Sequence, residues 1–169
     1  MKVLFNSETI ESRINEIALQ IWDRHKRDSK PIIMICVLDG GFMFYSKLVE
    51  KLAYLDPKCD FIKVKSYENQ TRGDLQLILT NSHPVEDSHV YIVDDIYDSG
   101  ITLNSLRDIL FKSNPKSVNL VTLIKRSINE MDFPKNSIYG FEIKSEWVIG
   151  FGMDDENGNK RSLPNILAI

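Results

Sequence analysis

Three aspartates and a glycine-containing turn stand together in the stretch VYIVDDIYDSGITL, residues 90–103. An apolar run ends at Asp94 and Asp95, Asp98 follows, and Ser-Gly-Ile-Thr leads into a helical pattern. A strand, a glycine turn and a helix start are typical of a phosphate site, because the first turn of a helix presents unpaired N–H groups. The stretch contains no Lys or Arg. The three carboxylates therefore need a role other than direct contact with phosphate.

A phosphorylated sugar would give each part of this stretch a role. Backbone N–H groups and two hydroxyls of residues 98–102 can surround a phosphate, and Gly100 permits close approach and a positive φ. A carboxylate about 4 Å from a phosphate oxygen repels it by about 4 kcal/mol at an effective dielectric near 20. Asp94 and Asp95 are therefore expected to face ribose hydroxyls or Mg²⁺. Taken alone, however, two aspartates at the end of a strand are more often solvent-exposed loop residues without a function.

The elements around this stretch predict an α/β fold. Isoleucines at 10, 14, 17 and 21 mark an amphipathic helix, with Ser7 as its expected N-cap. Apolar runs predict strands at 31–38, 59–67, 74–80, 90–93, 117–124, 137–143 and 146–153. Helical spacing follows the first and the fourth of these runs. Alternating strands and helices favour a parallel sheet, which binds ligands beyond the carboxyl ends of its strands.

The composition limits the class of protein. A chain of 169 residues fits a single domain, residues 1–169. The net charge of −3 and the pI of about 5.6 argue against a nucleic-acid partner. No apolar run is long enough to span a bilayer, so no membrane partner is expected. Two isolated cysteines, Cys36 and Cys59, fit a reducing cytoplasm. We therefore expect a cytoplasmic protein.

Residues 90–103 resemble the phosphoribosyl-pyrophosphate motif of type I phosphoribosyltransferases, and the whole chain is similar to the hypoxanthine-guanine phosphoribosyltransferases of purine salvage. The similarity runs in order through VLDGGFMF (37–44), SYENQTRGD (66–74), the motif itself, LIKRS (123–127), GFEI (140–143) and EWVIGFGMD (146–154). The resemblance implies a mainly parallel twisted sheet flanked by helices, a small hood from the terminal segments and a flexible flap at about 66–74. It also implies transfer of the 5-phosphoribosyl group from phosphoribosyl pyrophosphate to a 6-oxopurine, hypoxanthine or guanine, to give IMP or GMP and pyrophosphate.

The resemblance also assigns roles to single residues. Asp98 would be the general acid/base at the purine N7, and the ribose and its 5′-phosphate would be bound by Asp94, Asp95, Asp98, Ser99, Gly100, Ile101 and Thr102. Pyrophosphate would be bound by Asp39, Gly40, Gly41, Ser66, Tyr67 and Arg161. The purine would contact Lys125 at its 6-oxo group, Trp147 by stacking, and the backbone of Val148. The Mg²⁺ cofactor would be held by Asp94, Asp95 and Asp154.

Three positions depart from the pattern of the relatives. Asp39 stands where many of them have Lys or Arg, and Ile101 replaces a common Lys. The segment after Asp154 is one residue longer, so that Lys160 or Arg161 is the expected basic residue near pyrophosphate, and the RSLPNI alignment favours Arg161. The resemblance to the family also implies that the protein is a homodimer or homotetramer.

Three alternatives remain open from the sequence. The first is an enzyme of the same kind that prefers xanthine. The second is a phosphoribosyltransferase-like regulator that senses nucleotides and binds nucleic acid, since a fold alone does not fix function. The third is a diphosphate-sugar binder without a base pocket. Pyrophosphate release that depends on the purine distinguishes these possibilities.

Overall fold

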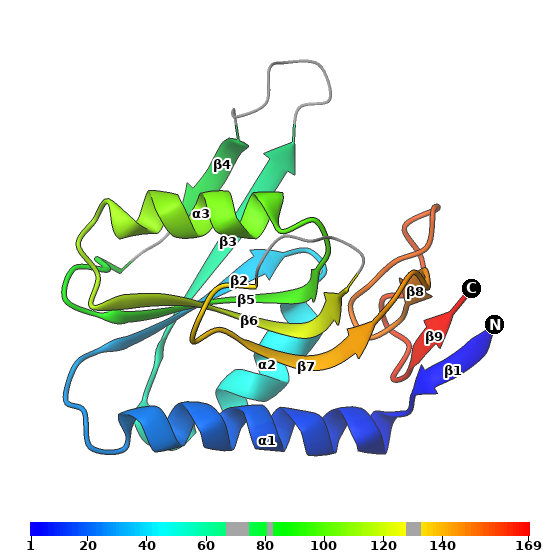
Figure 1. The fold of residues 1–169 in the computed structure, drawn as a ribbon, viewed down its shortest axis with the longest axis horizontal. Helices are drawn as coiled ribbons and strands as arrows, with labels where there is room; N and C mark the ends of the chain where they lie inside the picture. The colour runs from blue at the N-terminus through cyan, green and yellow to red at the C-terminus, as the bar shows by residue number, and fades with distance from the viewer. Residues whose placement is uncertain (67–74, 81–82, 128–132) are drawn as a thin grey trace.

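A twisted six-stranded sheet forms the centre of the protein (Figure 1). The structure is a computed structural model that describes residues 1–66, 75–80, 83–127 and 133–169. The strands lie in the order β4-β3-β2-β5-β6-β7, and all neighbours are parallel except β4, which runs antiparallel to β3. Their bounds are β2 (Ile32–Leu38), β3 (Lys58–Ser66), β4 (Leu75–Thr80), β5 (His89–Tyr97), β6 (Ser117–Arg126) and β7 (Ile138–Ile143).

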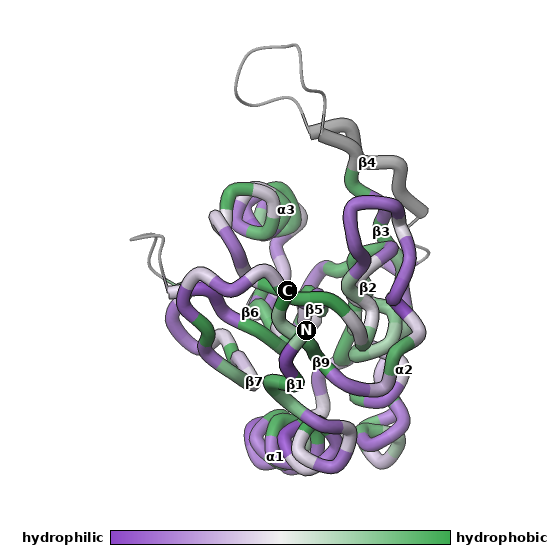
Figure 2. Tube along the Cα trace, turned by 90° about the vertical axis from the view of Figure 1, so that its right-hand side faces the viewer, coloured by the Kyte–Doolittle hydropathy of each residue, from purple (hydrophilic) through white to green (hydrophobic). Residues whose placement is uncertain are grey.

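Helices cover both faces of this sheet. α1 (Ser7–His25) and α2 (Phe42–Lys51) lie on one face, and α3 (Ile101–Phe111) lies on the other (Figures 1 and 2). A short 3₁₀ turn, η1 (Ala53–Leu55), follows α2. The chain moves outward to β3 on one side of β2 and to β6 on the other side of β5. The order of strands therefore reverses between β2 and β5, and ligands of open α/β sheets bind at such a point.

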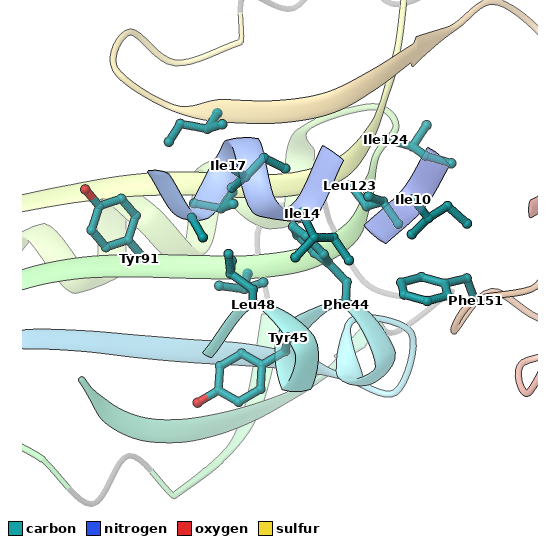
Figure 3. Close-up of a cluster of buried hydrophobic side chains, with 14 of the residues drawn as sticks. Ile10, Ile14, Ile17, Phe44, Tyr45, Leu48, Tyr91, Leu123, Ile124 and Phe151 are labelled. Atoms are coloured by element: carbon teal, nitrogen blue, oxygen red, sulfur yellow. The ribbon is translucent and has the colours of Figure 1, made fainter. Parts of the chain in front are cut away.

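The apolar stripe predicted for the first helix is confirmed. Ile10, Ile14 and Ile17 are buried against the sheet, together with Phe44 and Leu48 of α2 (Figure 3). Ile21 belongs to the same buried cluster. A second cluster lies under α3, where leucines 103, 106 and 110 pack on the opposite face of β2, β5 and β6. Apolar side chains on both faces explain the continuous apolar runs of the central strands.

The predicted N-cap of α1 is wrong by one residue. The cap is Asn6, whose Oδ1 accepts a hydrogen bond from the backbone N–H of Thr9 at 2.8 Å. Ser7 is the first residue of the helix, and its backbone N–H donates to Oδ1 of Asn165 at 2.9 Å. Asn and Ser are both good caps, so local preference did not distinguish the two adjacent positions.

The terminal segments form a separate antiparallel sheet, the hood sheet, in the order β1-β9-β8. Its strands are β1 (Lys2–Phe5), β8 (Val148–Ile149) and β9 (Ile166–Ala168). The strand predicted at 146–153 is therefore much shorter, because the chain turns through positive φ angles of 93°, 49° and 104° at Gly150, Phe151 and Gly152. The two termini lie close together in this sheet (Figure 2).

The helices of the described ranges include none that is long and apolar enough to cross a membrane.

Candidate active site

The turn between β5 and α3 encloses a small cavity, the loop cavity. It has a volume of about 180 Å³ and is lined by Asp94, Ile96, Asp98, Ser99, Gly100, Thr102 and Leu103. Gly100 has φ +76°, and a Cβ at this position would lie 2.3 Å from the Oη of the buried Tyr97. Only glycine fits here without strain. Ile101 is exposed and does not line the cavity, so its side chain leaves the space above the turn open.

A second cavity, the Trp147 cavity, adjoins the first. It has a volume of about 150 Å³ and is lined by Asp95, Ile96, Asp98, Arg126, Trp147, Val148, Met153 and Asp154. Trp147 is 60% exposed, whereas Val148 is buried in the hood sheet. Ile96 and Asp98 line both cavities. The Asp98 carboxylate therefore stands where a ligand that fills both spaces would be joined.

Asp94 and Asp95 form a crowded pair of acids at the end of β5. Asp95 is buried, Asp94 is partly buried, and the Asp95 backbone N–H donates to Asp94 Oδ1 at 2.9 Å. Burial, and then the charge of Asp95, raise the pKa of Asp94 well above its ordinary value, and burial also raises the pKa of Asp95. A cation or hydroxyl donors beside the pair would stabilise its ionised forms. The residues therefore fit the predicted role with Mg²⁺ and a diol.

Arg126 connects Asp98 to the wall of the Trp147 cavity. Its Nε lies 3.1 Å from Asp98 Oδ1 as an ion pair, and its Nη1 donates to the backbone oxygen of Glu146 at 2.6 Å. The Arg126 side chain is only 11% exposed. The guanidinium thus bridges the end of β5 and the residue that precedes Trp147, and it fixes the spacing of the two sides of the cavity.

Lys125 takes a different direction from Arg126. Its Nζ lies 3.4 Å from Glu142 Oε1 and 5.0 Å from the centre of the Tyr139 ring. Lys125 is not among the residues that line the Trp147 cavity. Neighbouring side chains of a strand point to opposite faces of the sheet, which explains the separation of Lys125 from Arg126. Purine contact by Lys125 stays a prediction.

The Asp39-Gly40-Gly41 loop lies beside the acid pair. A Cβ at Gly40 would lie 2.1 Å from Asp95 Oδ2, so the loop backbone passes directly against this carboxylate. The Asp39 side chain turns to β3, where Lys63 Nζ donates to both carboxylate oxygens at 3.0 and 2.9 Å. This bond, followed by the charge of Lys63, lowers the pKa of Asp39 below its ordinary value. The negative charge that distinguishes this loop thus has a positive partner.

Asp154 and Arg161 form an ion pair next to the same loop. Arg161 Nη2 lies 2.6 Å from Asp154 Oδ2, and Nη1 donates to the backbone oxygen of Gly152 at 2.6 Å. The positive charge of Arg161 helps to lower the pKa of Asp39, and it opposes the increase in the pKa of Asp95 that burial causes. The guanidinium therefore acts on both carboxylates. Lys160 instead lines a cavity on the other side of Trp147, with Met1 and Ile169. The pyrophosphate contact of Arg161 stays a prediction.

The predicted flap cannot be compared with the structure. Tyr67 and the rest of 67–74 lie outside the described residues, and Ser66 is described only as the backbone end of β3. In the part of the chain that is described, Asp94, Asp95 and Asp154 do not gather into one three-carboxylate cluster. Asp95 and Asp154 line the Trp147 cavity, and Asp94 lines the loop cavity.

Comparison with known proteins identifies the family. Residues 2–156 match the model of the phosphoribosyl transferase domain. The chain belongs to this family. The curated hypoxanthine phosphoribosyltransferase of Salmonella typhimurium is 33% identical over 91% of the chain and 87% of its own length. The hypoxanthine-guanine-xanthine phosphoribosyltransferase of Tritrichomonas foetus is 33% identical over 98% of the chain and 89% of its length.

The solved structures agree with the predicted fold. The hypoxanthine phosphoribosyltransferase of Trypanosoma cruzi in complex with the product IMP matches with a TM-score of 0.90 at 32% identity. The match covers 99% of this chain and 93% of the Trypanosoma chain. The expected fold, a type I phosphoribosyltransferase-like parallel sheet flanked by helices, is confirmed.

Two residues of the site were not assigned a role from the sequence. Arg126 stands next to the predicted Lys125, and strand alternation is a signal that one of the two must face the opposite side. Lys63 has no local signal, because it meets Asp39 only through the parallel pairing of Leu38 with Lys63. Both residues bring positive charge to carboxylates of the site.

Proposed function

We propose that this chain is a purine salvage enzyme, a glycosyltransferase that moves the 5-phosphoribosyl group from phosphoribosyl pyrophosphate to a 6-oxopurine. Hypoxanthine is the first expected base and guanine the second, and the products are IMP or GMP and pyrophosphate. The names of the curated relatives support this reaction. The observation that carries it is the position of Asp98, which lines both the loop cavity and the Trp147 cavity.

The two cavities suit the two ends of the nucleotide. The turn at 99–102 offers backbone N–H groups and the Ser99 and Thr102 hydroxyls to the 5′-phosphate at the start of α3. The base stacks on Trp147, a contact worth about 1–3 kcal/mol, and meets the backbone of Val148. Asp98 then accepts or donates the proton at N7 of the purine, held in position by Arg126. Lys125 contacts the 6-oxo group of the base after its ammonium has separated from Glu142.

Asp94 and Asp95 hold the ribose hydroxyls, directly or through Mg²⁺, and Asp154 contributes to a second Mg²⁺ near pyrophosphate. When bound, Mg²⁺ neutralises the charge of the leaving pyrophosphate. To hold a metal, Asp154 would release Arg161, whose guanidinium would then be available to pyrophosphate. The crowding of Asp94 and Asp95 supports this assignment, because both carboxyls have a raised pKa that a cation would reverse.

Lys63 supplies positive charge to the pyrophosphate loop. The loop carries Asp39 in place of a basic residue, and its backbone at Gly40 passes directly against the Asp95 carboxylate. Lys63 is partly exposed and is held at the loop by Asp39, so it is in place to contact a pyrophosphate oxygen. In this proposal Ser66 and Tyr67 also contact pyrophosphate, and residues 1–169 form one domain. The protein acts in the cytoplasm as a homodimer or homotetramer.

A base-dependent assay tests the proposal. Pyrophosphate release with hypoxanthine, guanine, xanthine and adenine should be fast for the first two bases and slow for adenine. Xanthine as the best base would support the xanthine-preferring alternative. No release with any base, together with salt-dependent binding of nucleic acid, would support a regulator instead.

Asp98→Ala tests the role of the acid. We expect kcat for IMP formation to fall by about 10²–10⁴-fold, the usual contribution of general acid/base catalysis. The matched control is Asp108→Ala, an exposed aspartate of α3, the helix that follows Asp98, whose contact with Arg107 is a long 3.9 Å. Near-normal turnover in Asp98→Ala would exclude the assigned role, and a loss in both variants would point to a general effect on the fold.

A further inference from the structure

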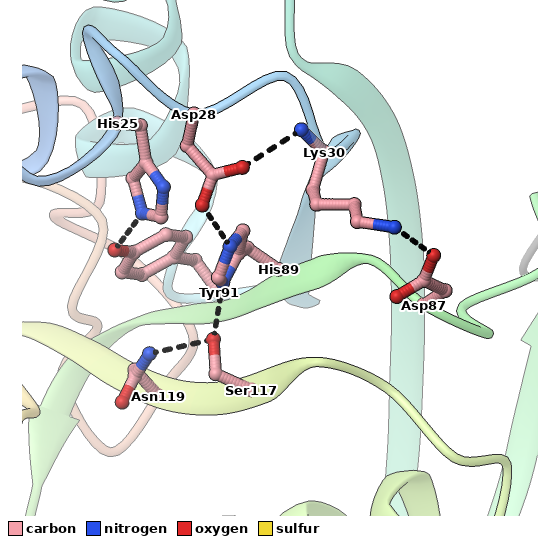
Figure 4. A network of polar contacts seen from close by, with 8 residues as sticks. All are labelled: His25, Asp28, Lys30, Asp87, His89, Tyr91, Ser117 and Asn119. Carbon is pink, nitrogen blue, oxygen red and sulfur yellow. Dashed lines mark hydrogen bonds and ion pairs between the residues drawn. The ribbon is translucent and has the colours of Figure 1, made fainter.

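A compact polar cluster, the histidine cluster, lies at the opposite edge of the sheet from the candidate active site. It consists of His25 at the end of α1, Asp28 in the following turn and His89 at the start of β5 (Figure 4). One nitrogen of each imidazole and one oxygen of Asp28 lie within 4.8 Å of one another. The acid pair of the active site is at the carboxyl end of β5, so the two places are separate.

His25 is the most deeply buried residue of the histidine cluster. His25 is buried, with only 6% of the residue exposed, and its Nε2 lies 2.7 Å from Tyr91 Oη. Among the described residues, the buried Nδ1 of His25 has no hydrogen-bond partner. In Figure 4 this nitrogen is on the side of the ring that faces Asp28 and His89. A buried polar atom without a partner destabilises the fold unless something binds it.

We propose that His25, Asp28 and His89 bind one divalent transition-metal ion, Zn²⁺ in the first instance. The ligand atoms are His25 Nδ1, His89 Nε2 and a carboxylate oxygen of Asp28. Two imidazoles and one carboxylate form a common donor set for zinc, with a fourth position open to water. Ligands of a tetrahedral zinc stand about 3.4 Å apart, so the atoms need to approach by at most about 1.4 Å. Asp28 is 33% exposed, which provides both an entry path and room to move.

The second ring nitrogen of each histidine already has the partner that a metal ligand requires. His25 Nε2 faces Tyr91 Oη, and His89 Nδ1 lies 2.7 Å from Ser117 Oγ (Figure 4). If each of these nitrogens donates its N–H, the other nitrogen of each ring presents its lone pair to the cluster. Such outer contacts orient metal-binding histidines and select their tautomers. The backbone N–H of Lys30 likewise donates to Asp28 Oδ1 at 2.9 Å.

The two cationic side chains next to the cluster, Lys30 and Arg24, have partners outside it. Lys30 points away from it, because its ammonium pairs with Asp87 (Figure 4). Arg24 donates to the backbone oxygen of Asn136 at 2.6 Å, and its positive charge contributes least to lowering the pKa of His25, after burial and the charge of His89. Burial, followed by the charge of His89, lowers the pKa of His25, and the neutral imidazole is the form that binds a metal. The competing explanation is a hydrogen-bond network alone, in which His89 Nε2 donates to Asp28 at 2.9 Å and His25 Nδ1 stays unbound.

A bound ion would clamp α1 to the start of β5. The test is titration of untagged, chelator-treated protein with Zn²⁺ by calorimetry, in saturating Mg²⁺ so that the carboxylates of the active site are occupied. We expect one equivalent of Zn²⁺, and a rise in Tm of about 5–10 °C at a free Zn²⁺ concentration a hundredfold above Kd. Titration with Co²⁺ should give the visible absorption of a site with nitrogen ligands.

Two variants and one control locate the ion. Asp28→Asn keeps the shape of an exposed side chain, and His89→Gln keeps a group that can bond Ser117; each should weaken Zn²⁺ binding by at least about tenfold. Asp87→Asn removes a charge from the same surface outside the cluster and should bind like the wild type. Wild-type protein that binds no Zn²⁺, or variants that bind it equally well, would overturn the proposal. Phosphoribosyl transfer in Mg²⁺ should be unchanged in Asp28→Asn, so this test is independent of the proposed function.

Discussion

Gly100→Ala should damage the turn between β5 and α3 in two separable ways. An alanine at φ +76° costs about 1–2 kcal/mol for its left-handed backbone. Its Cβ would also lie 2.3 Å from the Oη and 2.5 Å from the Cζ of Tyr97. Tyr97 cannot withdraw easily, because its ring is buried and packs edge-on against Phe133 at 4.9 Å. Overpacking of this kind costs about 1–3 kcal/mol more. The free energy of unfolding should therefore fall by about 2–5 kcal/mol.

Gly158→Ala is the matched control, because Gly158 has φ +77° and no atom within 4 Å of an added Cβ. This variant should lose only the backbone contribution of about 1–2 kcal/mol. Denaturant unfolding of both variants gives the steric difference. Steady-state kinetics should show that Gly100→Ala lowers kcat/KM for phosphoribosyl pyrophosphate by about 10–100-fold, because a shift of about 1 Å in a binding group has such effects.

The reasoning would be refuted if the two alanine variants lost equal stability and both kept the wild-type kcat/KM. In that case the turn tolerates a side chain, and the 5′-phosphate is bound elsewhere. A loss of stability in Gly100→Ala without a loss of kcat/KM would refute the phosphate assignment alone.

Two further variants examine the charges of the site. Asp94→Asn keeps the acceptor for the Asp95 N–H and removes an acid whose pKa is raised, so at pH 7 it should increase Tm by a few degrees, where 1 kcal/mol corresponds to about 2–4 °C. An acid whose pKa is raised in the folded state destabilises the fold at pH values above the ordinary pKa of 3.8, so the gain in Tm should shrink as the pH falls through the raised pKa. A gain in Tm that is the same at every pH would argue against a raised pKa of Asp94. IMP formation should fall in Asp94→Asn at any pH. Lys63→Ala should raise KM for phosphoribosyl pyrophosphate about fivefold, equivalent to about 1 kcal/mol, and an unchanged KM would remove Lys63 from the pyrophosphate site. Asp39→Asn keeps one oxygen that can accept from Lys63 Nζ, so it should raise KM less than Lys63→Ala does.

The central elements could be predicted from the sequence because their signals are local. A strand buried on both faces needs a continuous apolar run, and β2 shows one at residues 32–38. The start of α3 was predictable because Gly100 and the leucine spacing after it define a helix entry. The resemblance to a known family extended this from elements to a complete fold, which the structural match confirms.

The remainder depends on contacts between distant segments. Asp39 and Lys63 are neighbours only because β2 and β3 pair in one register. The histidine cluster joins residues 25, 28 and 89, which share no local pattern. The strand predicted at 146–153 was too long for another reason, since an apolar sequence with two glycines can turn as readily as extend. Residue types in such places indicate chemistry but not orientation.

The hood sheet also affects the order in which the molecule can assemble. β9, at residues 166–168, is the middle strand, so β1 and β8 join one sheet only through hydrogen bonds to β9. The six-stranded sheet, by contrast, is complete by residue 143. Pairing Lys2 with Ala168 closes a loop that spans almost the whole chain, and such long-range closure is slow. During synthesis, the hood sheet with Val148 therefore cannot form until residues 166–168 have been made, after every strand of the six-stranded sheet.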